Sequence, residues 1–413
     1  MTTHSPIRVT VIGAALSANK GAAAMVETVM SRLPDAVGEC EFTILTTYPR
    51  EDARYLDNES DARIVGLQPI RLALIEFPIA CLVAVARVLH LPLFWARSRG
   101  CRSMLDADVV VDVAGISFAD NRGIPILFYN AIMTGTPLLL GTPVVKAGQA
   151  LGPFDSRINR LLAKLVLPRL AAICARGSQT RQHLDSLGLT NIVDVADLAF
   201  SLDEAAVLPD AVIQAINAVG EGFIVVMPSS VVRRIVETQG IDYVEGIVHL
   251  VNEIRQSTQR GVVIAAHSYR AGHPEGRMND GPVCREVAAR CAGDAMVVGI
   301  DADLSAGELR HLVAQSSVTV TSRFHAMISG LSTCTPTLVV GWSHKYREVL
   351  DDFGLAEYGM DATALADPPA IATKVGEMLH HRDAISQQIS TGLVAVKERS
   401  LRNFEVIAKV VKK

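Results

Sequence analysis

Short β-branched apolar runs alternate with helical segments along most of this chain of 413 residues. The alternation begins at Ile7–Gly13, restarts at Phe223–Met227 and continues through Val318–Thr321. Strands that are each followed by a helix form parallel sheets with helices on both faces. The fold class expected is therefore α/β, with two doubly wound, Rossmann-like domains. Ligands of such sheets bind outside the carboxyl ends of the strands, and we expect a cleft between the two domains.

The stretch 202–222 is rich in acidic residues and proline before a short helix, which is typical of a connection between domains. We expect an N-terminal domain over residues 1–205 and a second domain over 206–383. A C-terminal helix over 384–413 is expected to pack back on the first domain. Each half is long enough to bury a core of its own.

Composition excludes several classes of protein. Hydrophobic residues make up 49% of the chain and charged residues 20%, which excludes disorder. A net charge of −4 without a basic block argues against nucleic acid as a partner. The seven cysteines form no Cys-x-x-Cys pair, so we expect reduced thiols in the cytosol and no metal site. The short polar start has no signal-peptide character, and a cytoplasmic location is expected.

The junction after the strand Val318–Thr321 carries the strongest signal for a site. Ser322 is a residue type that caps helices, so Arg323 and His325 are expected in the first turn of the next helix. Unpaired N–H groups and the helix dipole attract anions there, and two cationic side chains strengthen the attraction. Lys345, at the next helix start, would add a third. The sequence predicts a phosphate or carboxylate site. In the alternative, Arg323 pairs with an acidic neighbour and His325 fills a helix end.

Other strand ends also carry polar or small residues. Gly115 would let a ligand approach the backbone, and Arg176 ends a short strand, where we expect it to be exposed in a cleft. His267 follows another strand. Gly13 and Gly21 bracket the first turn between strand and helix, but their spacing is not that of a dinucleotide fingerprint.

The segment Leu72–Trp95 contains the apolar run Phe77–Ala86, which is too short to span a bilayer and is interrupted around Pro78. Pro78 is expected to break any helix into two pieces. The run is either a helix in the core of the first domain, which we favour, or a helix that rests at a membrane interface. The residues that would serve at an interface are Arg71, Arg87, Arg97, Arg99, Arg102, Phe94 and Trp95.

Several motifs recur in a characteristic order along the chain. They are Asn19-Lys20-Gly21-Ala22, Gly148 to Phe154, Ala175-Arg176, Asp197 to Phe200, His267-Ser268-Tyr269, Asp280, and Ser322 to Ala326 followed by Pro336 and Lys345. In this order and spacing the chain resembles the polysaccharide pyruvyl transferase family over most of its length. Two positions depart from the family pattern. Gly177 replaces the aspartate that usually follows the mid-chain arginine, and Val113-Ala114-Gly115 stands where relatives often have a run of glycines.

The resemblance implies a GT-B-like architecture and a transferase that depends on phosphoenolpyruvate. Such an enzyme transfers a carboxyethylidene group to sugar hydroxyls as a ketal and releases phosphate. Phosphoenolpyruvate is then a co-substrate, and no cofactor is expected. The acceptor is expected to be a saccharide or a lipid-linked saccharide, a precursor of a cell-surface polysaccharide or glycolipid. It is expected on the N-terminal domain, with phosphoenolpyruvate on the second. Contact with the inner face of the membrane is a further expectation.

The resemblance implies that Arg176, Arg323 and His325 are donor-site groups. Arg176 and His325 are the expected catalytic residues, and His325 is the expected general acid. The residues expected to bind substrates are Arg323, Phe324, Lys345, Asn19, Gly115, Gln149, His267 and Asp120. The general base stays open among Asp112, Asp120 and His267.

The chemistry of phosphoenolpyruvate agrees with these residue types. Its phosphate and carboxylate suit arginine forks, and a histidine with an ordinary pKa of about 6.5 can protonate C3 of the enol near neutral pH. Two other functions remain open. One is a GT-B glycosyltransferase that uses a nucleotide sugar, and the other is a binding protein without catalysis in an envelope-assembly complex.

Overall fold

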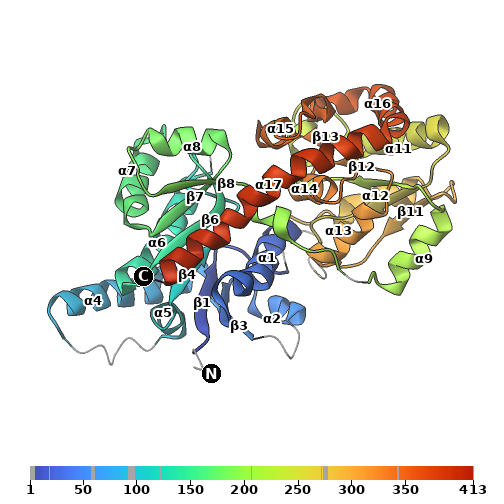
Figure 1. The fold of residues 1–413 in the computed structure, drawn as a ribbon. Helices are drawn as coiled ribbons and strands as arrows, with labels where there is room; N and C mark the ends of the chain where they lie inside the picture. Colours follow the sequence, from blue (N-terminus) through green and yellow to red (C-terminus); the bar gives the residue numbers. More distant parts are fainter. Residues whose placement is uncertain are drawn as a thin grey trace. The chain divides into compact units, whose positions relative to one another are not determined.

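The computed structural model describes residues 5–17, 19–56, 61–91, 98–120, 122–205, 207–270, 272, 278–341 and 344–412. These residues form two compact units (Figure 1). Unit 1 comprises Met1–Ser17, Met25–Leu202 and Lys397–Lys413, and unit 2 comprises Ala18–Ala24 and Asp203–Val396. The long middle of the chain therefore changes unit at Leu202, where we expected a boundary at residue 205.

Unit 1 is built on a parallel sheet with the strand order β3-β2-β1-β4-β6-β7-β8, and β5 pairs with β6. All four residues of β4 are buried, as expected of a parallel sheet that is covered on both faces. The strands are β1 Ile7–Ile12, β2 Cys40–Thr46, β3 Ala62–Gly66, β4 Val109–Asp112, β5 Ile116–Ser117, β6 Val144–Leu151, β7 Ala172–Arg176 and β8 Ile192–Val195.

Helices connect these strands and cover the sheet. The start of α1, up to Ala24, belongs to unit 2, and the rest of that helix belongs to unit 1. The helices are α1 Lys20–Val37, α2 Pro49–Asp52, η1 Ala53–Tyr55, α3 Pro69–Arg71, η2 Leu72–Glu76, α4 Phe77–Val88, α5 Arg99–Leu105, α6 Ile124–Leu140, α7 Arg157–Val166, η3 Leu167–Arg169, α8 Ser178–Asp185 and η4 Leu198–Ser201.

Unit 2 repeats the same design with the parallel order β11-β10-β9-β12-β13-β14. The predicted α/β class with two parallel sheets is confirmed, and a capping box links Ser305 and Glu308. The strands are β9 Ile224–Met227, β10 Val262–Ala265, β11 Val297–Ile300, β12 Val318–Thr321, β13 Thr337–Gly341 and β14 Gly359–Asp361. The helices are α9 Asp210–Val219, α10 Ser230–Glu237, α11 Tyr243–Thr258, α12 Gly281–Arg290, α13 Ala306–Ala314, α14 Phe324–Ser332, α15 His344–Asp351, η5 Ala356–Tyr358, η6 Ala362–Ala366 and α16 Pro368–His380.

The last helix, α17 (Arg382–Val411), begins in unit 2 and ends in unit 1. Within unit 1, the Ser400 hydroxyl donates to the carbonyl oxygen of Asp197 over 2.8 Å. The Asn403 amide donates to the carbonyl oxygen of Ala196 over 3.1 Å. The end of α17 is therefore bound to the loop that follows β8.

The apolar segment after residue 68 differs from the expectation. It forms one continuous helical stretch, Pro69–Val88. By length and composition this stretch could cross a membrane, and 28% of its most apolar 18-residue part is buried. Pro78 does not break it, because the wider π-turn η2 comes directly before and Pro78 lies in the first turn of α4. Leu82 and Val85 are 58% and 57% exposed, so the interpretation as a core helix is wrong for this face. Phe94, Trp95 and Arg97 lie outside the described residues.

Candidate anion-binding site

The junction between β12 and α14 lies at a strand carboxyl end of unit 2. α14 begins at Phe324, and Arg323 is the N-cap residue with extended backbone angles (φ −116°, ψ 129°). The cap is thus one residue later than predicted, and the Thr321 hydroxyl accepts the Arg323 N–H over 2.9 Å. The Tyr346 hydroxyl donates to the carbonyl oxygen of Ser322 over 3.1 Å, which fixes the turn.

Arg323 is only 8% exposed and pairs with Asp280, which is fully buried. Arg323 Nε donates to Asp280 Oδ2 over 2.7 Å, and Nη2 donates to Oδ1. The backbone N–H groups of Ser230 and Ser268 complete the carboxylate's contacts, at 2.8 and 3.1 Å. Burial opposes the charged form of Arg323, but Asp280 outweighs it and the pKa of Arg323 is raised. The alternative that Arg323 pairs with an acidic neighbour is confirmed, and this pairing holds the guanidinium in one orientation.

His267 lies near several positively charged side chains of unit 2. It is buried, and its pKa is lowered well below the usual value, first by burial and then by the charges of His325, Arg323, Lys20 and Arg310. A concentration of positive charge in a buried site favours anions.

Two members of this cluster were not among the predicted site residues. Lys20 is fully buried, and its ammonium lies 2.6 Å from Asp303. Arg310 is also buried, on α13. The motif around Lys20 pointed to the first of them. Arg310 had no sequence signal, because it lies in the middle of an ordinary amphipathic helix.

The imidazole of His325 rests against the first turn of α1. A Cβ atom built on Gly21 would lie 2.0 Å from His325 Nδ1 and 2.4 Å from its Cγ, so only glycine fits this contact. Asn19 holds the same turn, since its side-chain oxygen accepts the Gly21 N–H over 3.1 Å. The expected residues Asn19 and His325 are thus brought together, and the glycine of the Asn-Lys-Gly motif is explained by the close approach.

Aromatic rings complete this group. The ring of Phe324 meets that of His325 edge to face with centroids 5.2 Å apart. The Lys345 ammonium lies 4.8 Å from the centroid of Phe324 and 5.6 Å from that of Tyr346, a cation–π arrangement. Phe324, His325 and Lys345 therefore form one cluster beside Arg323.

In unit 1, Arg176 ends β7 as predicted, but it is 7% exposed, so the expectation of an exposed arginine was wrong. Its Nη1 donates to the carboxylate of Asp197, and its Nη2 donates to the carbonyl oxygen of Gly115 over 3.1 Å. Gly177, with φ at 83°, is the N-cap residue of α8 and supplies no carboxylate. Asp197, which follows β8, provides the negative charge for Arg176.

Gln149 belongs to a buried network at the carboxyl end of β4. Its side-chain amide donates to Asp112 Oδ1 over 2.7 Å and accepts from the Ser117 hydroxyl over 2.8 Å. The Lys146 ammonium lies 2.5 Å from Asp112 Oδ2, and all four side chains are buried. These contacts give Gln149 and Asp112 structural partners, which disfavours Asp112 as a general base.

Asp120 binds the turn before α7, whose N-cap residue is Ser156. Its carboxylate accepts from the N–H groups of Asp155 and Ser156 at 2.6 and 3.0 Å and from the Ser156 hydroxyl at 2.7 Å. Burial would raise its pKa, but these hydrogen bonds outweigh burial and lower it. The lowered pKa of His267 keeps its imidazole neutral at neutral pH.

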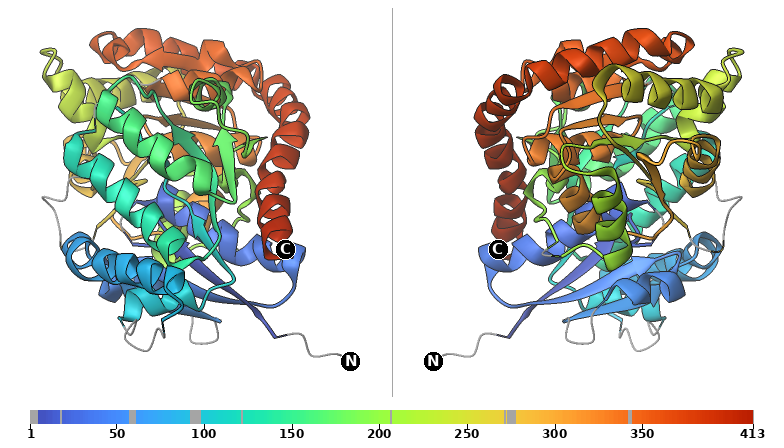
Figure 2. Two further views of the ribbon diagram at one scale, coloured as in Figure 1. Left: turned by 90° about the vertical axis from the view of Figure 1, so that its left-hand side faces the viewer. Right: turned by 90° about the vertical axis from the view of Figure 1, so that its right-hand side faces the viewer.

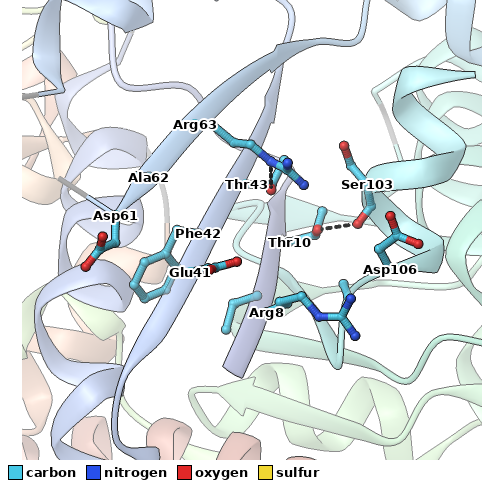
Figure 3. Close-up of a pocket in the computed structure, with 12 residues that line it drawn as sticks. Arg8, Thr10, Glu41, Phe42, Thr43, Asp61, Ala62, Arg63, Ser103 and Asp106 are labelled. Carbon is cyan, nitrogen blue, oxygen red and sulfur yellow. Dashed lines mark hydrogen bonds between the residues drawn. The ribbon is translucent and has the colours of Figure 1, made fainter. Parts of the chain in front are cut away.

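A separate cavity of about 270 Å³ lies at the amino ends of β1 and β2 (Figure 3). Arg63 Nε donates there to the Thr43 hydroxyl over 2.7 Å, and the Thr10 hydroxyl donates to the carbonyl oxygen of Ser103. Ligands of parallel sheets bind at the opposite ends of the strands, and none of the predicted site residues lines this cavity.

The chain is similar to known proteins in both sequence and structure. A model of the polysaccharide pyruvyl transferase family matches residues 19–344. The amylovoran biosynthesis protein AmsJ of Erwinia amylovora is 24% identical over 318 residues, which cover 74% of this chain and 72% of that protein.

Solved structures show the fold alone. A UDP-glucosyltransferase from Polygonum tinctorium has a TM-score of 0.59 at 11% identity and covers 100% of both chains. The UDP-GlcNAc 2-epimerase from Neisseria meningitidis has a TM-score of 0.58 at 12% identity, over 96% of this chain and 99% of that one. The expected GT-B-like fold class is confirmed by this likeness.

Proposed function

Because the chain belongs to the polysaccharide pyruvyl transferase family, we propose that it transfers the carboxyethylidene group of phosphoenolpyruvate to two hydroxyls of a sugar. One observation in particular supports phosphoenolpyruvate as the donor. Arg323 is oriented by Asp280. The charges of Arg323, His325, Lys20 and Arg310 act together on the buried His267. Phosphoenolpyruvate carries a phosphate and a carboxylate, and it is the kind of compact dianion or trianion that such a cluster binds.

In the proposed reaction, His325 donates a proton to C3 of the enol, and C2 becomes electrophilic. The first sugar hydroxyl attacks C2, and a second hydroxyl then displaces the phosphate and closes the ketal. Each hydroxyl loses one proton. One of these protons restores the acid, and the other leaves with the phosphate, so atoms and charge balance. Neutral His267 is the proposed acceptor of a hydroxyl proton.

The remaining residues have supporting roles in this proposal. Arg323, Lys345 and Phe324 bind the donor, and Asn19 holds the helix turn against His325. Arg176 is proposed as a further donor-site group. Its buried pairing with Asp197 would keep its guanidinium in place. On the acceptor side, Gly115, Gln149 and Asp120 shape the strand ends of unit 1 through the contacts described above.

The acceptor is proposed to be a saccharide or lipid-linked saccharide precursor of a cell-surface polysaccharide, handled in the cytoplasm. The relative that acts in amylovoran biosynthesis supports a role in polysaccharide production. No cofactor takes part in the proposed chemistry.

The test is phosphate release from phosphoenolpyruvate across a panel of saccharide acceptors, with mass analysis of each product for the carboxyethylidene increment. UDP-GlcNAc serves as the competing donor, since nucleotide-sugar enzymes share the fold. We expect phosphoenolpyruvate, and not UDP-GlcNAc, to protect the protein against thermal unfolding. Turnover of nucleotide sugars without phosphate release from phosphoenolpyruvate would overturn the proposal. Binding of saccharides without any turnover would indicate the non-catalytic alternative.

A further inference from the structure

The helical stretch Pro69–Val88 exposes large apolar side chains along one face. Ala80, Val83 and Ala86 of α4 are buried against unit 1, whereas the opposite face is open. The exposed apolar residues of this stretch and the turn after it are Ile70, Leu74, Ile75, Leu82, Val85, Val88, Leu89 and Leu91. Monomeric proteins rarely expose this many large apolar side chains side by side, so the face marks an interaction site.

Two neighbouring helices continue this surface. α4 packs against α6, and α6 packs against α7, and the left view of Figure 2 faces this side of unit 1. α6 exposes Ile124 and Phe128 near its start. α7 buries Ala163 and Val166 but exposes an apolar row that consists of Ile158, Leu161 and Leu165. We call the exposed apolar residues of Pro69–Leu91, α6 and α7 together the α4–α7 face.

The exposed charged residues on Pro69–Val88, α6 and α7 have one sign. The exposed basic residues Arg157, Arg160 and Lys164 lie on α7 next to its apolar row. Arg87, which is also exposed, lies near the end of α4. Within Pro69–Val88, α6 and α7 the one acidic residue is Glu76. It is fully buried, and Arg71 and the Cys101 N–H bind its carboxylate at 3.0 and 2.8 Å. The face therefore presents apolar and cationic groups but no exposed carboxylate.

We propose that the α4–α7 face rests on an anionic lipid surface. Apolar side chains would enter the boundary of the acyl region, and the arginines and Lys164 would meet lipid phosphates, as in other interfacial helices. A membrane-spanning role fits less well, because one side of α4 is packed into unit 1 and the carboxylate of Glu76 ties the stretch to α5. A second copy of the chain is also disfavoured, since two identical cationic faces would repel each other.

This inference does not depend on the proposed reaction, and sedimentation with vesicles tests it separately. We expect the full-length protein to bind vesicles of phosphatidylcholine with phosphatidylglycerol and to lose binding in high salt or with pure phosphatidylcholine. The triple variant Arg157→Gln, Arg160→Gln, Lys164→Gln should bind on the order of 100-fold more weakly, since each cation near an anionic surface contributes about 1 kcal/mol. The double variant Leu82→Asp, Val85→Asp should lose binding as well.

Val394→Asp is the matched control, because Val394 is 65% exposed on α17 and lies outside the α4–α7 face. It should bind vesicles like the wild type. Circular dichroism checks folding, and if the aspartate double variant unfolds, the charge-neutral triple variant decides. Absence of wild-type binding at low salt overturns the inference, as does equal loss in Val394→Asp. A dimer in light scattering that Leu82→Asp dissociates, without vesicle binding, would assign the face to a second copy instead.

Discussion

The contact between Gly21 and His325 allows a test of His325 without changing His325 itself. In Gly21→Ala, the new methyl group would lie 2.0 Å from Nδ1, whereas ordinary contact begins at 3.4 Å, so the ring must retreat by about 1.4 Å. A displacement of about 1 Å in a catalytic group can cost on the order of 100-fold in rate. We therefore expect phosphate release to fall about 100-fold.

Stability should change little in the same variant. Alanine favours the helix over glycine by up to about 1 kcal/mol, and overpacking costs about 1–3 kcal/mol. The net cost should be about 0–2 kcal/mol in urea unfolding, too little to abolish folding. Loss of activity in a folded protein would then come from the displaced imidazole.

Gly376→Ala is the matched control, since its methyl group would meet no atom within 4 Å inside α16. It should keep full activity and gain up to about 1 kcal/mol. In a His325→Ala background, Gly21→Ala should cause no further loss of activity, because the clashing ring is gone. Wild-type activity in Gly21→Ala, or additive losses in the double variant, would refute the reasoning.

Three further predictions concern His325, Asp280 and His267. His325→Ala should lower kcat for phosphate release by about 10²–10⁴-fold with little change in KM, and unchanged kcat would remove His325 as the acid. Asp280→Asn should cost about 3–5 kcal/mol in urea unfolding, because the Arg323 guanidinium loses its buried counter-charge; a loss below 1 kcal/mol would contradict this. His267 has a lowered pKa in the folded state, so below about pH 6.5 the unfolded chain binds a proton that the folded chain does not. The free energy of unfolding should therefore decrease as the pH is lowered below about 6.5, by up to about 1.4 kcal/mol per pH unit. In unfolding measurements at pH 5 to 7, His267→Gln should make this pH dependence weaker.

The strands and the main helix starts could be predicted because they depend on local pattern. The run Val318–Thr321 is buried and β-branched, and the strand has those bounds in the structure. The capping box at Ser305 depends on residues three positions apart, which a sequence shows directly. Such features need no knowledge of distant partners.

The partners of charged residues could not be predicted in the same way. Asp280 and Arg323 are 43 positions apart and Arg176 and Asp197 are 21 apart, and only the folded sheet brings each pair together. Exposure of the apolar run was missed for a related reason. Leu82 and Val85 have the composition of a core helix, and only the packing of α4 shows that they are left uncovered.

The path of the chain between the units has a practical consequence for anyone who wishes to divide this protein. Unit 2 takes its Ala18–Ala24 segment from the start of the chain, and unit 1 takes its Lys397–Lys413 segment from the end. A cut at Leu202 would leave unit 1 without Ser400 and Asn403, whose side chains bind the carbonyl oxygens of residues 196 and 197. Neither unit is one continuous stretch of gene. Domain exchange between relatives would therefore need four coordinated junctions, and a single crossover would yield two incomplete halves.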